Sequence, residues 1–128
     1  MLRAERRMKE SRTANPIEDK SFRFAVRTVK LSRYLTEEKK EHVLSNQLLR
    51  SGTSIGANVS EGVRAQSKPD FVHKMSVALK EAGETAYWLR LLHETGYLTD
   101  EQFESVYSDA NELIALLVSI CKSASSNL

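Results

Sequence analysis

The sequence is poor in the residues that build disulfide frameworks and tight turns. Its 128 residues include one cysteine, two prolines and five glycines. A single cysteine excludes an intrachain disulfide and a cysteine-rich metal site. Cys121 lies in an apolar-periodic stretch, which is typical of a half-buried structural thiol. The scarcity of glycine and proline argues against an all-β chain with many turns and favours long helices.

Long hydrophobic runs are also missing. No stretch approaches the roughly 20 apolar residues that span a bilayer. The basic N-terminal residues have no apolar core of the kind that a secretory signal needs. Charged residues make up 28% of the chain and hydrophobic residues 41%, as in ordinary soluble domains. We therefore expect a cytoplasmic protein with no membrane partner.

Positive charge is concentrated at the N-terminus. Residues 1–15 hold five basic and two acidic side chains, although the whole chain carries a net charge of only +2. A charge excess of this kind is a property of a tail rather than of a domain. We divide the chain into a basic, flexible tail over residues 1–15, one folded domain over residues 16–124 and a frayed end over residues 125–128.

Four helix-start signals divide the folded domain. Each combines a capping side chain with a proline or an acidic residue in the first turn. They stand at Asn15, Thr36, Ser67 and Thr99. The first helix should end at about Tyr34 or Leu35. Gly96 should end the third, because a left-handed residue after a helix costs glycine little.

Apolar residues recur at spacings of three and four within each of these segments. They are Phe22, Phe24, Ala25, Thr28, Val29, Leu31 and Leu35 in the first, Val43, Leu44, Leu48, Ile55 and Val59 in the second, Phe71, Met75, Ala78, Leu79, Ala82, Ala86, Leu89 and Leu92 in the third, and Phe103, Val106, Tyr107, Ala110, Leu113, Ile114, Leu117 and Ile120 in the fourth. Short connections make consecutive helices antiparallel. We therefore expect an all-α fold, an antiparallel up-down-up-down four-helix bundle.

The stretch SGTSIGANVSEG, residues 51–62, has more glycine and hydroxyl residues than a helix interior usually holds. On a helical wheel Ser51 and Gly62 fall on the apolar side of the second helix, and Asn58 and Glu61 lie at its margin or just beyond. The third helix carries small residues of its own. We expect the two helices to approach closely, with Asn58 and Glu61 hydrogen-bonded to neighbouring groups.

No catalytic or metal-binding pattern accompanies this stretch. A serine nucleophile would need a positioned histidine, but no G-x-S-x-G elbow exists and the histidines lie on polar flanks. A di-iron bundle would need two Glu-x-x-His pairs, and the only comparable spacing is Asp70-x-x-His73. Phosphate-loop and zinc patterns are missing too. We therefore expect no enzyme activity, no metal and no cofactor.

Five basic residues follow one face of the first helix at spacings of three and four, and we call them the basic stripe. They are Lys20, Arg23, Arg27, Lys30 and Arg33. The pattern is typical either of a solvated helix face or of a surface that follows nucleic-acid phosphates. No aromatic residues alternate with these cations, so the pattern does not favour sequence-specific recognition of a single strand.

The third helix is apolar on nearly all sides through one turn, around Leu89. A four-helix monomer buries only one face of each helix. Tyr87, Trp88 and Leu91 are therefore predicted to form an oligomer interface. The alternative is that Trp88 covers the end of its own bundle.

The run QLLRSGTSIGANVSEG, with FVHKMSVALKEAGET after it, resembles the bacterial four-helix bundle family first noted in intervening sequences of 23S rRNA genes. The resemblance covers roughly residues 18–122. It is carried by Gln47, Leu48, Arg50, Ser54, Ile55, Asn58, Glu61 and Gly62, and in the third helix by Phe71, Ala78, Gly83 and Glu84. Val59 stands where isoleucine is usual.

The resemblance implies a small antiparallel bundle that assembles as a homopentamer. It also implies a structural role for the motif residues Gln47, Arg50, Ser54, Asn58, Glu61 and Gly62. A related branch, the accessory variability determinant protein of diversity-generating retroelements, engages nucleic acid and a reverse transcriptase. A reverse transcriptase or another protein is therefore a further candidate partner.

Two functional hypotheses follow from the sequence. The leading one is a non-enzymatic homo-oligomer that binds RNA, DNA or a ribonucleoprotein through the basic stripe. The alternative is a protein–protein scaffold or adaptor that binds no nucleic acid, in which the same charges only keep the protein soluble.

Overall fold

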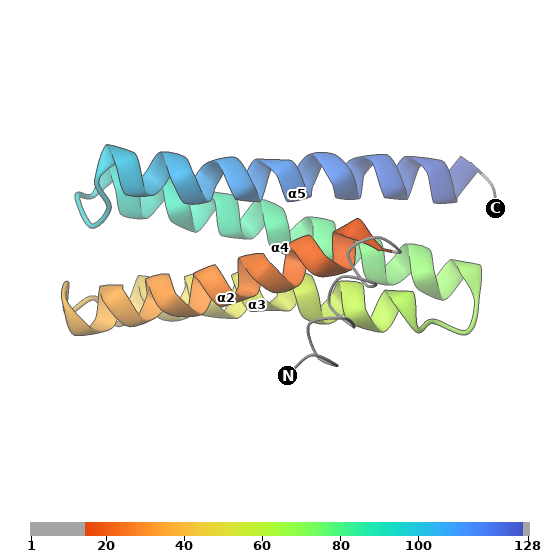
Figure 1. Cartoon of the computed structure of the whole chain (residues 1–128), viewed down its shortest axis with the longest axis horizontal. Helices are drawn as coiled ribbons and strands as arrows, with labels where there is room; N and C mark the ends of the chain where they lie inside the picture. The colour runs from red at the N-terminus through yellow and green to blue at the C-terminus, as the bar shows by residue number, and fades with distance from the viewer. Residues whose placement is uncertain (1–14, 127–128) are drawn as a thin grey trace, which may run out of the picture.

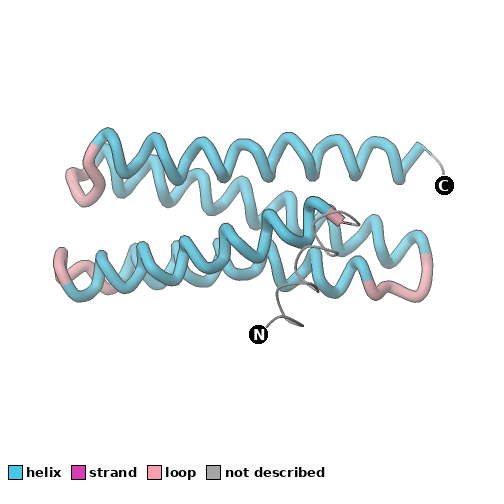
Figure 2. The backbone as a smooth tube through the Cα atoms, in the orientation of Figure 1, coloured by secondary structure: helices cyan, strands magenta, loops and turns pink. Residues whose placement is uncertain are grey.

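The computed structural model describes residues 15–126, and within this range it consists of four α-helices (Figure 1). They are α2 (Pro16–Glu37), α3 (Val43–Val63), α4 (Lys68–Glu94) and α5 (Asp100–Ser126). Consecutive helices run antiparallel, side by side, and short loops join them (Figure 2). The predicted all-α up-down-up-down bundle is confirmed.

The predicted domain bounds differ slightly from the helix bounds. α5 continues to Ser126, past residue 124, where we placed the end of the bundle. The predicted tail over residues 1–15 lies outside the described residues except for Asn15, and residues 127–128 of the predicted frayed end also lie outside them.

Three of the four predicted helix starts are capped as expected. Asn15 and Ser67 each accept a hydrogen bond from the backbone N–H three residues on, at 3.4 and 3.2 Å. The Thr99 hydroxyl accepts from the Gln102 N–H at 3.1 Å, and Gln102 Oε1 accepts from the Thr99 N–H at 2.9 Å, a reciprocal capping box. Gly96 follows α4 with a φ of +85°, a left-handed conformation that suits glycine.

The second helix begins later than the sequence predicted, so the cap assigned to Thr36 is wrong. Thr36 still belongs to α2, and its hydroxyl donates to a backbone carbonyl of that helix at 3.0 Å. The first turn of α3 is capped by Glu41 instead, whose Oε2 accepts from the Ser45 N–H at 2.8 Å. Between the helices the chain reverses through Lys40, which has a φ of +56°.

One hydrophobic core extends along the bundle. Its largest fully buried side chains come from all four helices and include Leu35, Leu48, Ile55, Met75, Leu89, Leu92, Leu113 and Leu117. Three predicted core positions are on the surface instead: Phe22, Val29 and Val43 are 60%, 38% and 70% exposed. α2 buries a narrower face than its pattern predicted, because it packs closely against α3 and only lightly against α5.

Residues 51–62 are a segment of α3 with one buried face, whose small residues set the distance to both neighbouring helices. A β-carbon at Gly52 would lie 2.5 Å from Cγ2 of Thr28 in α2. On the α4 side, the hydroxyls of Ser51 and Thr85 are hydrogen-bonded at 2.9 Å. Ser51 and Gly62 are buried, as the helical wheel predicted.

Candidate functional site

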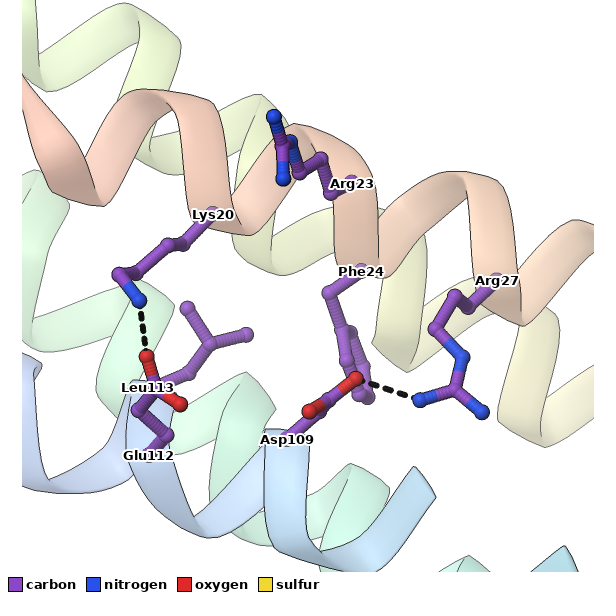
Figure 3. Close-up of a pocket in the computed structure, with 7 residues that line it drawn as sticks. All are labelled: Lys20, Arg23, Phe24, Arg27, Asp109, Glu112 and Leu113. Carbon is purple, nitrogen blue, oxygen red and sulfur yellow. Dashed lines mark hydrogen bonds and ion pairs between the residues drawn. The ribbon is translucent and has the colours of Figure 1, made fainter. Parts of the chain in front are cut away.

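The basic stripe borders the seam between α2 and α5. These helices are the first and last of the described bundle, and they pack against each other less closely than the consecutive helix pairs do. Figure 3 shows Lys20 and Arg27 extending from α2 toward acidic side chains of α5. The predicted stripe is therefore partly a boundary between two helices, not an isolated solvated face.

Two stripe cations form ion pairs across this seam. Lys20 Nζ pairs with Glu112, and Arg27 Nη1 lies 2.5 Å from Asp109 Oδ2. Arg27 Nη2 also donates to the Ser105 hydroxyl at 2.9 Å. The paired acids reduce the positive field of the stripe. The spacing of cations within α2 does not reveal them, because the acids are 82 and 92 residues further along the chain.

The other three stripe cations differ in their pairing. Arg23 Nε lies 3.2 Å from Asp19 Oδ2 of the same helix. The side chains of Lys30 and Arg33 form no hydrogen bond or ion pair with any other residue in the range 15–126. Both are exposed. When only the described residues are considered, the unpaired charge of the stripe is therefore confined to its C-terminal half.

Two hollows lined by described residues follow the seam. The smaller, of about 170 Å³, lies between the two cross-seam ion pairs, with Phe24 and Leu113 among its lining residues (Figure 3). The larger, of about 550 Å³, is further along α2, and we call it the seam groove. It is lined by Arg27, Lys30, Leu31 and Tyr34 of α2 and by Glu101, Gln102, Ser105 and Val106 of α5. Its volume is in the range of small-ligand sites.

Sequence reasoning missed Tyr34 and Gln102 as members of a site. Tyr34 stands four residues after Lys30, so the two share one side of α2. That spacing is visible in the sequence, but Tyr34 stands just beyond Arg33, the last residue of the stripe. No sequence signal indicates Gln102, because its place opposite Lys30 depends on how α5 packs against α2.

The motif residues Gln47, Arg50, Ser54, Asn58 and Glu61 form one row along α3, at spacings of three and four. Asn58 Nδ2 donates to the Ser54 carbonyl at 2.8 Å, and the Ser54 hydroxyl donates to the Arg50 carbonyl at 2.6 Å. These bonds stay within α3. They satisfy polar groups locally and bring no nucleophile and base together.

The end of this row faces α4. Glu61 pairs with Lys74 at 3.5 Å, and a β-carbon at Gly62 would lie 2.9 Å from Met75 Cε. The hydrogen bond expected of Asn58 is present, and Glu61 forms an ion pair. A structural role for the row agrees with these contacts.

The predicted interface residues of α4 differ in exposure. Tyr87 is 55% exposed and contacts Trp88 edge to face, with ring centroids 5.1 Å apart. Trp88 and Leu91 are half-buried, and Trp88 Nε1 donates to Glu84 Oε1 at 3.3 Å. An oligomer interface at these three residues stays a prediction.

Glu81 is a perturbed acid that the sequence reasoning did not single out. Burial, reinforced by the charge of Glu84, raises the pKa of Glu81 above its ordinary value, and Arg50 opposes this only in part. The spacing of three residues between the two glutamates was a usable signal, since it places them on one side of a helix.

Metal-binding and membrane-spanning features are missing from the part of the chain that the structure describes. Within residues 15–126 no group of three or more histidine, cysteine, aspartate or glutamate side chains is placed to hold a metal ion. None of the described helices is both long enough and apolar enough to cross a bilayer.

Comparison with known proteins identifies the family. A family profile described as 23S rRNA-intervening sequence protein matches residues 14–119. The chain is also similar to a crystal structure from Bacteroides thetaiotaomicron VPI-5482, described as a protein of unknown function from the S23 ribosomal protein family. The identity is 56% and the TM-score 0.82, over 83% of this chain and 98% of that one. A comparison with curated proteins found no match. The chain belongs to the 23S rRNA-intervening sequence protein family.

Proposed function

We propose that this protein is a non-enzymatic module that assembles with copies of itself and binds nucleic acid through Lys30 and Arg33 of α2. The observation that supports this proposal is the absence of acidic partners for these two cations among the described residues. Lys30 lines the seam groove, and Arg33 lines a hollow between α2 and α3. Both cations can therefore pair with phosphates without first breaking an ion pair.

The remaining stripe cations contribute less to this site. Lys20, Arg23 and Arg27 already pair with carboxylates, so a phosphate must replace an existing partner. Exposed ion pairs contribute only about 0–1 kcal/mol, so the exchange is feasible, but the gain in binding is smaller than at an unpaired cation.

Self-assembly is supported by exposed apolar residues on two different faces. Phe22, Val26 and Val29 follow one side of α2, and Tyr87 projects from α4. Two separate patches on one chain favour head-to-tail contact between copies, which closes into a ring when the rotation permits. A ring, a pentamer in this proposal as the family resemblance implies, repeats Lys30 and Arg33 once per subunit and adds their fields along a bound strand.

Binding of labelled RNA and DNA, measured by fluorescence anisotropy over a series of salt concentrations, tests the proposal. The double variant Lys30→Glu, Arg33→Glu should weaken binding at least about tenfold and lower the slope of log affinity against log salt by about 2. Lys68→Glu with Lys122→Glu is the matched control, because it changes the net charge equally at exposed positions outside the stripe.

The two possible failures are easily recognised. If the wild-type protein binds neither RNA nor DNA at low salt, or if both double variants weaken binding equally, the proposed site is wrong. Light scattering on the same samples gives the number of subunits, and a monomer at working concentration contradicts the assembly.

A protein–protein scaffold is the second candidate function. It is favoured by the ion pairs of Lys20, Arg23 and Arg27, which leave the stripe less basic than its sequence indicates. A scaffold should purify without nucleic acid, and its ratio of absorbance at 260 and 280 nm should be that of pure protein.

A further inference from the structure

The seam groove combines an apolar base with polar groups that have no partner among the residues that the structure describes. Val106 is buried and Leu31 is half-buried, so they form an apolar base between the helices. Tyr34 is half-buried in the same groove, and within residues 15–126 its hydroxyl has no hydrogen-bond partner. A half-buried aromatic ring that lines an open groove is suited to stack against a planar group.

Two nitrogen donors border this apolar base. Lys30 supplies an ammonium group from α2 that pairs with no side chain in the range 15–126. Gln102 supplies an amide from α5, and the capping box orients it: Oε1 accepts from the Thr99 N–H at 2.9 Å, so Nε2 is the end that remains without a partner among the described residues. The groove therefore offers donors from both of its walls.

Glu101 and Arg27 limit where a ligand's negative charge can lie. Glu101 lines the α5 wall near Gln102 and repels phosphate there. Arg27 is engaged with Asp109 and Ser105 at one end of the groove. Within the described part of the chain, Lys30 is the lining cation without a partner, so a phosphate is favoured on the α2 wall and an uncharged, planar group against the apolar base.

We propose that the seam groove binds one unpaired nucleotide of a single-stranded nucleic acid, with its base against Tyr34 and Leu31 and its phosphate on Lys30. This inference rests on the proposed function and specifies its ligand as a single strand. A duplex keeps its bases stacked inside, and only an unstacked base can enter a groove between two helices. The absence of aromatic residues within the stripe therefore does not exclude contact with a base, because the aromatic residue comes from the wall of the groove.

The test compares three ligands on the full-length protein: a short single strand, the duplex of the same sequence, and the same strand made abasic. All three carry phosphates, but only the first offers bases that can be unstacked. We expect the single strand to bind about tenfold more tightly than the other two, and Tyr34→Leu to remove that preference while Tyr34→Phe retains it.

A second variant keeps the proposal testable if Tyr34→Leu does not fold. Gln102→Glu preserves the capping box, since glutamate accepts the same Thr99 N–H, but replaces the Nε2 donor with a negative charge. It should weaken single-strand binding about tenfold and leave the melting temperature unchanged. Asn111→Asp, an equal charge change at an exposed site on the same helix, should have little effect.

The outcomes separate this inference from the proposed function. If the wild-type protein binds the strand, the duplex and the abasic strand equally, or if Gln102→Glu behaves like Asn111→Asp, the groove is not a nucleotide site, although the protein still binds nucleic acid. If the wild-type protein binds none of the three at low salt, both proposals are wrong.

Discussion

Gly52 lies so close to Thr28 that a β-carbon at position 52 would be 2.5 Å from Thr28 Cγ2 and 2.6 Å from its Oγ1. The Thr28 side chain cannot easily move away, because it is buried and its hydroxyl donates to the Phe24 carbonyl at 2.8 Å. The backbones of α2 and α3 therefore approach at a point where any larger residue is excluded.

Gly52→Ala should destabilise the protein for this reason. Alanine favours a helix by about 1 kcal/mol over glycine, but the forced contact with Thr28 should cost about 1–3 kcal/mol. The net result is a lower free energy of unfolding, measured by denaturant titration. A variant as stable as the wild type would show that α2 and α3 can separate without cost.

Gly83→Ala is the matched control for Gly52→Ala, and we expect it to have the opposite effect on stability. Gly83 is exposed in the middle of α4, and a β-carbon there would have no neighbour within 4 Å. The helix propensity of alanine then acts alone and should raise the free energy of unfolding by up to about 1 kcal/mol. A loss of stability in this variant would indicate that another surface packs against Gly83.

The buried hydroxyls of Ser51 and Thr85 should stabilise the folded state only when both are present. Thr85→Val keeps the shape of the side chain but leaves the Ser51 hydroxyl with only a 3.4 Å contact to the Leu48 carbonyl. We expect a loss of about 1–3 kcal/mol. Ser51→Ala combined with Thr85→Val should cost less than the sum of the single changes. Strict additivity in denaturation experiments would contradict the coupling.

Glu81→Gln should change how stability depends on pH. The pKa of Glu81 is raised by burial and by Glu84, so the protonated form is favoured in the folded state. The stability that protonated Glu81 contributes is fully present below the pKa of Glu81 in the unfolded chain. It is lost as the pH rises through the pKa of Glu81 in the folded protein. Glu81→Gln should melt at a higher temperature than the wild type at about pH 7, and the difference should disappear at about pH 4. Parallel melting curves at both pH values would contradict the raised pKa.

The ion pair between Arg27 and Asp109 should contribute little to stability. Their side chains are 39% and 44% exposed, so solvent screens the attraction. A double-mutant cycle with Arg27→Met and Asp109→Asn should give a coupling energy of at most about 1 kcal/mol that decreases with salt. A coupling that is much larger and insensitive to salt would mean that this pair holds the seam closed.

Local sequence patterns correctly predicted those helix ends whose stabilising groups lie within one turn of each other. The caps at Ser67 and Thr99 and the left-handed Gly96 involve neighbouring residues only, and all three are present. Thr36 misled the prediction because its hydroxyl has a competing acceptor inside α2, one turn back. Helix patterns also cannot show how much of a face is covered, so the exposure of Phe22 and Val29 was not foreseen.

The sequence by itself determined four amphipathic helices, their antiparallel order and a close contact at the small residues of α3, because spacing, capping and side-chain size are properties of the chain. Only the tertiary structure decided which cations of α2 keep their charge available. Lys20 and Arg27 are paired with acids of α5, whereas Lys30 borders a groove beside Tyr34. An ion pair or a groove depends on the distance between atoms of different helices, and only the packing of the bundle sets that distance.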